Sequence, residues 1–154
     1  MAEPLPLKPI AWSETFATGE PEIDRQHREF LNQVNGLAAA AADGAPPDAI
    51  RSLLEAIAAH ERAHFAYEES VLQRIGHAEA AAHAAEHRRL ERRTAALLRS
   101  LLATAPDDGP CVLRVASIVR AQLLDHLLYY DLQYKSLLQY QREYRSLRQH
   151  LRRC

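Results

Sequence analysis

The sequence has little of what several protein classes require. It holds two cysteines in 154 residues, Cys111 and Cys154, too few for a thiolate metal site, so we expect free reduced thiols. The longest purely apolar run covers residues 37–42, which is far too short to span a membrane. Three prolines lie near the start, where a signal peptide needs an apolar stretch. These absences predict a soluble cytoplasmic protein.

An excess of one charge sign and strand-forming residues are also lacking. The 19 Lys and Arg residues nearly balance the 20 Asp and Glu residues, which leaves no basic field for nucleic acid or an anionic membrane. Valine and isoleucine supply 11 positions, whereas alanine and leucine supply 49. We therefore expect one all-α domain over residues 1–154, with no nucleic-acid partner and no membrane span.

Prolines and glycines divide the chain into an extended N-terminal arm, residues 1–18, and four long segments with apolar residues at helical spacing. The segments predict helices over about 20–42, 47–75, 78–103 and 110–148. The connections between them are short, so neighbouring helices must run antiparallel. The sequence predicts an up-down-up-down four-helix bundle with a long fourth helix.

Eight histidines stand out in this composition. His64 and Glu68 lie four residues apart in the second predicted helix, and His83 and His87 lie four apart in the third. Residues at this spacing point to the same side of a helix. Taken alone, such a pair is more often solvated than functional.

Two further histidines lie on the apolar sides of the first and fourth helices, His27 and His126. Imidazoles on four inward faces need partners, and a bound metal supplies them all at once. Imidazole and carboxylate ligands without thiolate favour iron, manganese or zinc. Asp131 follows His126 by five residues, which is about 140° around an ideal helix, so spacing alone does not recommend it.

The order of these residues resembles the hemerythrin family, specifically its bacterial single-domain members. The resemblance runs from Trp12 to about Leu138. It rests on W…G…ID-x-QH at Trp12, Gly19, Ile23, Asp24, Gln26 and His27, on HF-x-x-EE at His64, Phe65, Glu68 and Glu69, on H-x3-H at His83 and His87, and on H-x4-D at His126 and Asp131.

The resemblance implies a non-haem di-iron protein that binds dioxygen for storage, delivery or sensing and is not an enzyme. It implies one iron held by His83, His87 and His126, a second held by His27 and His64, and two bridging carboxylates, Glu68 and Asp131. With an oxo or hydroxo bridge, one octahedral position stays open on the two-histidine iron, and dioxygen would bind there. The candidate residues of the dioxygen pocket are Phe30, Phe65, Gln122, Leu123 and Leu127.

Three positions depart from the family's pattern. Leu72 stands where methionine is common and Leu90 where an aromatic residue is common, and both keep the position apolar. Gln122 replaces a common tryptophan four residues before His126. We expect its amide to admit water to the pocket, which would weaken the dry surroundings that protect bound dioxygen.

Two enzyme classes remain as alternatives. The stretch from His60 to His64 reads HE-x-x-H, the zinc peptidase signature in which Glu61 would be the general base. A peptidase also needs a third ligand and usually a sheet edge, and no strand pattern is present. A di-iron oxidase or peroxidase is the other alternative. We expect Glu61 to point away from the site, His60 to lie near the bundle interior or its rim, and His77 and His150 to be exposed.

The C-terminal segment differs in composition from the rest of the chain. Residues 132–154 carry six cations against one acid, Glu143, a local charge of about +5. Five of the six tyrosines lie from position 129 onward. We interpret residues 139–154 as a solvated basic helical tail whose cations suit a helix C-terminus. Tyrosine and arginine are also typical of interfaces, so a protein partner, self-association or an adaptor role stays open.

Overall fold

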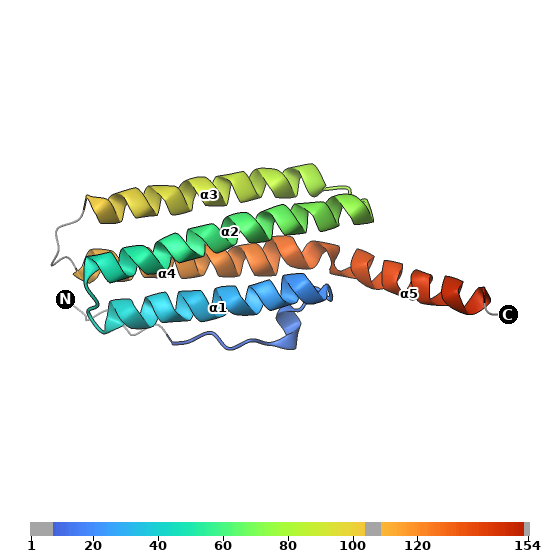
Figure 1. Ribbon diagram of the computed structural model, residues 1–154, viewed down its shortest axis with the longest axis horizontal. Helices are drawn as coiled ribbons and strands as arrows, with labels where there is room; N and C mark the ends of the chain where they lie inside the picture. Colours follow the sequence, from blue (N-terminus) through green and yellow to red (C-terminus); the bar gives the residue numbers. More distant parts are fainter. Residues whose placement is uncertain (1–7, 104–108, 153–154) are drawn as a thin grey trace.

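A computed structural model describes residues 8–103 and 109–152. Its long helices are α1 (Pro21–Ala42), α2 (Pro47–Ile75), α3 (Ala80–Leu102), α4 (Gly109–Asp125) and α5 (Lys135–Leu151). Helices α1 to α4 lie side by side with successive helices antiparallel, as Figure 1 shows. The described ranges contain no strand, and none of their helices could cross a membrane. The predicted all-α four-helix bundle is confirmed.

Local sequence signals account for the helix ends. The Glu20 carboxylate accepts a hydrogen bond from the Ile23 backbone N–H at 2.8 Å, and Pro21 begins α1. Pro47 begins α2 in the same way. Gly76 ends α2 with a φ of 68°, a left-handed conformation that glycine adopts without steric cost. The bounds predicted for the first three helices agree with the structure to within two residues.

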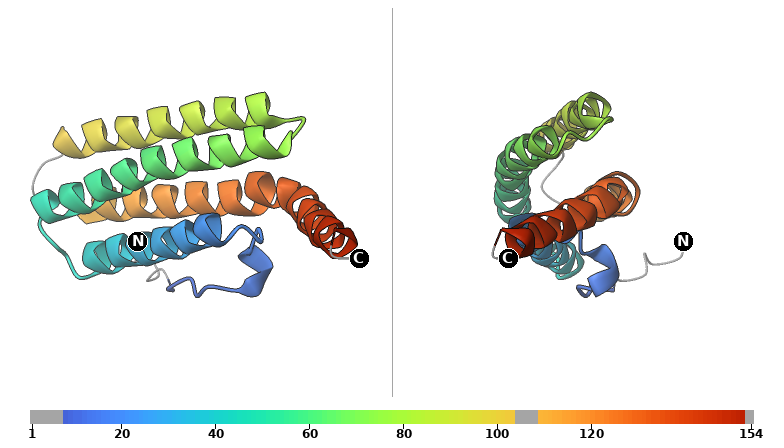
Figure 2. Two further views of the ribbon diagram at one scale, coloured as in Figure 1. Left: turned by 45° about the vertical axis from the view of Figure 1, so that its right-hand side comes forward. Right: turned by 90° about the vertical axis from the view of Figure 1, so that its right-hand side faces the viewer.

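The fourth helix is long, as predicted, but its backbone is not uniform. Helix α4 ends at Asp125 and is followed by a π-helical turn, His126–Tyr130, and a 3-10 turn, Asp131–Tyr134. Helix α5 then leaves the bundle at an angle and extends beyond its end (Figures 1 and 2). The change of helix type therefore separates α4, which belongs to the bundle, from α5, which projects from it.

The described part of the arm is fastened to α1. The buried Asp24 carboxylate accepts hydrogen bonds from the backbone N–H of Thr18 at 2.7 Å and of Gly19 at 3.1 Å. Farther along, the Asn35 side chain exchanges two hydrogen bonds with the backbone of Ile10, each 2.8 Å long. The arm therefore runs along the first helix, as Figure 2 shows. Residues 1–7 of the predicted arm lie outside the described residues.

Two apolar clusters form the core, one toward each end of the bundle. The larger joins the second halves of α1 and α3 to the first halves of α2 and α4, and includes Phe30, Leu37, Leu54, Leu101 and Val119. The smaller includes Ile23, Val71, Leu72, Ile75 and Tyr134. The polar side chains buried between these clusters come from all four helices of the bundle.

The first part of α5 still contacts the bundle. Leu137 and Leu138 pack against the smaller cluster, and the Gln141 amide donates a hydrogen bond to the Ile75 carbonyl at 2.8 Å. The side chains of residues 142–150 are exposed, and so is that of Tyr140, which stacks on Tyr144. Association through this tail stays a prediction, and its last two residues, 153–154, lie outside the described residues.

Candidate metal centre

Seven imidazole and carboxylate side chains meet between the two apolar clusters. Each is at most 3% exposed. Helix α1 contributes one, α2 two, α3 two, and the turns after α4 the last two. They are His27, His64, Glu68, His83, His87, His126 and Asp131. The structure thus brings together all seven side chains that the sequence indicated as metal ligands.

The π-helical turn explains how Asp131 reaches this group. The Asp131 backbone N–H bonds to the carbonyl of His126, five residues earlier, where an α-helix would bond to the residue four earlier. This wider turn brings residues five apart onto one face. The His126 Nε2 and Asp131 Oδ1 atoms consequently lie 3.0 Å apart. The 140° separation expected for an ideal helix does not apply here.

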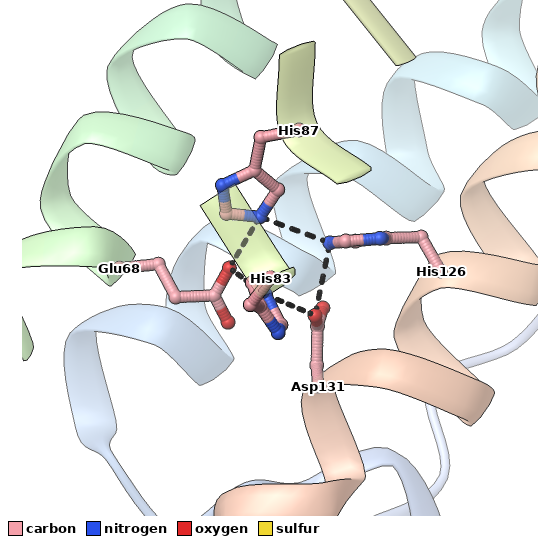
Figure 3. A group of neighbouring side chains, drawn as sticks. All are labelled: Glu68, His83, His87, His126 and Asp131. Carbon is pink, nitrogen blue, oxygen red and sulfur yellow. Dashed lines mark hydrogen bonds and ion pairs between the residues drawn. The ribbon is translucent and has the colours of Figure 1, made fainter. Parts of the chain in front are cut away.

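The donor atoms fall into two groups that share both carboxylates. One group contains Glu68, His83, His87, His126 and Asp131, drawn in Figure 3. The other contains His27, His64, Glu68 and Asp131, and within each group the donor atoms all lie within 4.8 Å of one another. Either group has the residue types and spacing to hold a metal ion.

The three-histidine group is held by short contacts. The Nε2 atom of His87 lies 3.0 Å from Glu68 Oε2 and 3.1 Å from His126 Nε2. His83 Nε2 lies 3.2 Å from Glu68 Oε2 and 3.3 Å from Asp131 Oδ1. Figure 3 shows the rings and carboxylates converging on a common centre. Both carboxylates thus contact more than one imidazole.

The two-histidine group has the same character with fewer donors. His27 Nε2 lies 3.1 Å from Asp131 Oδ2 and 3.3 Å from His64 Nε2. A neutral imidazole has one N–H, so two Nε2 atoms that face each other need a hydrogen on one of them to form a hydrogen bond. A metal ion bound between them would remove this need, because each nitrogen would then act as a ligand. The buried donor set therefore fits a metal pair better than it fits a network of hydrogen bonds.

Two residues fix the orientation of ligand rings from behind. The Gln26 amide oxygen lies 2.7 Å from His64 Nδ1 and accepts its hydrogen, which leaves Nε2 free to face the centre. Glu69 Oε1 lies 2.9 Å from His87 Nδ1 and is itself bonded by Arg88 at 2.7 Å. The sequence placed Gln26 and Glu69 inside the quoted motifs but did not indicate these roles.

The electrostatics keep both shared carboxylates ionised. Burial by itself would raise the pKa of Glu68, but hydrogen bonds from His83 and His87 hold it well below its usual value. Burial lowers the pKa of His64 to about 3, so this ring is neutral. Burial also disfavours charge on His83, but hydrogen bonds to Asp131 and Glu68 raise its pKa to about 10. The charged carboxylates are in the state that metal ligation requires.

Tyr134 also belongs to the centre, although the sequence placed it only among the tyrosines of the C-terminal segment. Its side chain is fully buried, and its hydroxyl donates a hydrogen bond to Glu68 Oε1. The nearby charges of Glu68 and Asp131 add to burial in raising the pKa of Tyr134, which stays protonated. The position three residues after Asp131 is the only sequence signal that could have indicated it.

A small cavity adjoins the two-histidine group. Its volume is about 10 Å³, which is room for roughly one water-sized molecule. Four of the five predicted pocket residues line it, namely Phe30, Phe65, Gln122 and Leu123. The fifth, Leu127, is fully buried in the π-helical turn but is not among the lining residues. Leu90, the apolar replacement noted in the sequence, lines the cavity as well.

Glu61 corrects an expectation from the sequence. We expected it to point away from the site, but it is 7% exposed and lines the same cavity. Three residues separate it from His64, so both lie on the inward side of α2. Its carboxylate accepts a hydrogen bond from the Thr94 hydroxyl at 3.0 Å, and burial raises its pKa to about 7. Thr94 was not indicated as a site residue, and Glu61 was indicated only as the general base of the alternative zinc peptidase signature.

The remaining histidines lie outside the donor groups. His60 stacks on Phe30 and contacts the Gln33 amide oxygen through Nδ1 at 2.9 Å, so the HE-x-x-H pair does not converge on one ion among the described residues. His150 is exposed, as predicted. His77 is half-buried instead of exposed, because its ring packs edge-on against Tyr134.

Known proteins provide an independent comparison. The family model described as the hemerythrin HHE cation-binding domain matches residues 18–138. The crystal structure of a wild-type hemerythrin is 30% identical, covers 84% of this chain and 97% of its own, and superposes with a TM-score of 0.72. A leucine-to-tyrosine hemerythrin mutant matches with the same identity and TM-score, over 96% of its own length. A comparison with curated proteins gives no match.

The matched residues 18–138 include all seven donors and leave out most of the exposed part of α5. The similarity to the solved hemerythrin likewise covers 84% of this chain. Fold, donor arrangement and sequence model therefore agree, and the chain belongs to the hemerythrin family.

Proposed function

We propose that this protein binds two iron ions and uses them to bind dioxygen reversibly, for storage, delivery or sensing. The observation that carries the proposal is the asymmetry of the two donor groups. Glu68 and Asp131 belong to both groups, but three histidines complete one group and two complete the other. The cavity is lined by both histidines of the two-histidine group, His27 and His64, and by only one histidine of the other, His126. A metal held by the two-histidine group would have fewer protein ligands and room for a small molecule beside it.

The donor chemistry supports iron in this role. The groups offer imidazole nitrogen and carboxylate oxygen and contain no thiolate. Such donors suit non-haem iron, and two groups joined by shared carboxylates suit a pair of ions. When bound, the iron pair supplies the electrons that dioxygen binding requires. The residues His83, His87 and His126 would hold one ion, and His27 and His64 the other, with Glu68 and Asp131 shared.

The chain's own side chains limit access to the cavity. The rings of Phe30 and Phe65 and the side chain of Leu123 line it, and none of these residues is exposed. Apolar walls keep bulk water out and so protect a bound small ligand from protonation and loss. Phe65 also stacks on His87 with a centroid distance of 3.9 Å, which fixes the ring of a ligand histidine.

A second candidate function is that of a di-iron oxidase or peroxidase. One observation favours it, because the Glu61 carboxyl lines the cavity and has a pKa raised to about 7. A group that titrates near neutrality can supply or accept protons there. Dioxygen binding remains our first proposal, since the family model and the structural neighbours are those of hemerythrins.

Metal analysis tests both candidates. Protein reconstituted anaerobically with ferrous ion should hold two irons per chain, and its oxidised form should show charge-transfer bands that azide shifts. Repeated cycles of oxygenation and deoxygenation without hydrogen peroxide release would support binding, whereas stoichiometric peroxide turnover would support the oxidase or peroxidase. Fewer than one iron per chain would contradict both.

A further inference from the structure

Three polar side chains from three helices form a hydrogen-bonded chain whose two end members line the cavity. The Gln122 amide N–H of α4 donates to the Thr94 hydroxyl of α3 at 3.1 Å. The Thr94 hydroxyl donates in turn to Glu61 Oε1 of α2 at 3.0 Å. All three residues are at most 7% exposed. Interactions of this kind inside a bundle are costly to leave incomplete, so the atoms without partners are informative.

The direction of this chain is fixed by its members. The Gln122 Nε2 atom also approaches the Leu90 carbonyl at 3.5 Å, which accepts only, so the amide nitrogen is on this side and the amide oxygen on the other. Thr94 accepts from Gln122 and has one hydrogen, which goes to Glu61 Oε1. Each donor therefore points toward Glu61, and its Oε1 atom is the end of the chain.

Two oxygen atoms remain without hydrogen-bond partners. They are Glu61 Oε2 and Gln122 Oε1, both fully buried. Both residues line the cavity beside the two-histidine group. No arginine or lysine donates to Glu61 in the described ranges, and a buried carboxylate without a cationic partner is unfavourable. Glu61 is accordingly neutral below about pH 7, and its hydrogen lies on Oε2 because Oε1 already accepts from Thr94.

We propose that Glu61 Oε2 donates a hydrogen bond into the cavity while Gln122 Oε1 accepts one, so that the cavity binds a single small polar ligand beside the metal centre. In the absence of another ligand this is a water molecule, since about 10 Å³ is room for roughly one. In the iron-loaded protein it is a small anion that accepts the hydrogen bond of Glu61, and only an anion that itself carries a hydrogen, such as hydroxide, also donates to Gln122 Oε1. Glu61 is thus a positioning residue for the cavity ligand.

The site explains why a glutamate occurs at this position. Apart from Glu61, Gln122 and the shared ligand Asp131, the cavity wall is built from imidazoles and apolar side chains, and a leucine at position 61 would pack against Phe30 and Phe65 without needing a partner. The Thr94 hydroxyl holds one oxygen of the Glu61 carboxyl, and the other oxygen is left to face the cavity. A protonated carboxyl in this position provides a hydrogen-bond donor at a fixed place, which an apolar residue cannot. The proposal predicts preference for ligands that carry negative charge over neutral apolar ones.

Azide is the probe for this test, and its use rests on the proposed iron centre. Azide affinity of the oxidised iron-loaded protein is followed through the charge-transfer band at pH 6. Glu61→Leu should weaken azide binding about tenfold, the effect of one lost hydrogen bond to a charged ligand, whereas Glu61→Gln, which keeps an N–H donor, should stay within about threefold. Glu55→Leu, an exposed position on the same helix, is the matched control and should match wild type. Equal affinities in all four iron-loaded proteins would overturn the proposal.

An infrared measurement keeps the two proposals separable. Wild type at pH 6 should show the carbonyl band of a protonated, buried carboxyl group that Glu61→Gln lacks, and azide should shift this band in the loaded protein. A merely structural Glu61 would give a band that azide does not move, and this result would also overturn the proposal. If wild type holds no iron, the proposed function fails, but absence of the band in the same sample still decides against a hydrogen on Glu61. If Glu61→Leu does not fold, the infrared comparison of wild type with the near-isosteric Glu61→Gln still tests the proposal.

Discussion

The two sides of the metal centre use the same residue types but differ in how they are enclosed. On the three-histidine side, His83, His87 and His126 approach the shared carboxylates and each other closely, and Glu69 holds His87 from behind. On the two-histidine side, the protein provides one imidazole fewer and a cavity. Under the proposed function, one group would retain a metal, whereas the other would retain a metal and still admit a ligand.

The shared carboxylates join the two sides, so their loss should have the largest effect. Glu68→Ala removes a donor from both groups and leaves the Tyr134 hydroxyl without its partner. We expect iron content to fall from two per chain to less than one, with loss of the paired-iron spectrum. Iron analysis and absorption spectroscopy after anaerobic reconstitution test this, with Glu55→Ala as an exposed control on the same helix. Retention of both irons would mean that Glu68 is not a shared ligand.

Glu61 distinguishes the cavity side through the pH dependence of stability. Its pKa is about 7 in the folded protein against 4.5 for an ordinary glutamate, so between these values the folded state binds more protons. The unfolding free energy of wild type should therefore fall by about 3 kcal/mol, relative to Glu61→Gln, as pH rises from 4 to 8. Burial is the main cause of the shift, with Glu91 raising the pKa and His126 and Arg62 lowering it.

Urea denaturation at pH 4 and pH 8 measures this difference, with both proteins in the same metal state. The other titrating groups are present in both proteins, so the difference isolates Glu61. Glu55→Gln, at an exposed position, should show no such divergence from wild type. A constant difference between wild type and Glu61→Gln across this range would show that Glu61 is charged or hydrated in the folded protein.

Most of the centre could be predicted from the sequence because helical spacing is local. His64 with Glu68, and His83 with His87, need only an α-helix to share a face. The position of Asp131 could not be derived in this way, because it depends on a π-helical turn whose formation depends on the surrounding packing. The resemblance to hemerythrins supplied this residue, whereas periodicity did not.

The residues that were missed act across helices. Thr94 and Glu61 lie on different helices and 33 positions apart, so their contact leaves no short-range pattern in the sequence. The Tyr134 hydroxyl reaches Glu68 from 66 positions away. Glu61 was misplaced because the spacing of three from His64 fits both an inward position and the rim of an apolar face, and only packing decides between them.

The residues behind the ligand rings allow the two sides to be compared directly. Glu69→Ala frees His87 on the three-histidine side, and Gln26→Ala frees His64 on the two-histidine side. Loss of such an orienting partner typically weakens metal affinity by about 10- to 100-fold. Because the Glu69 contact involves a carboxylate and is the stronger hydrogen bond, we expect the larger loss for Glu69→Ala. Competition with a chelator measures the iron affinity of both variants. A larger loss of affinity for Gln26→Ala would mean that the two-histidine side, and not the three-histidine side, holds its metal more tightly.

Gln122 should give the smallest effect, because it limits access to the cavity without belonging to either donor group. It lines the cavity on the inside and, on the outside, a pocket of about 290 Å³ that also includes Tyr129 and Tyr130. Its amide therefore lies between the metal centre and solvent. Gln122→Trp would place an apolar ring in this wall and use the outer pocket to accommodate the added volume.

We expect this substitution to slow autoxidation of the oxygenated protein by roughly two- to fivefold, because it removes a polar group that can hold water beside the bound ligand. Stopped-flow oxygenation followed by decay of the oxygenated band provides the measurement, with unchanged iron content as the condition for comparison. A faster decay would contradict this expectation. It would show that the Gln122 amide stabilises the bound ligand by a hydrogen bond, so that this polar side chain protects the oxygenated protein from autoxidation.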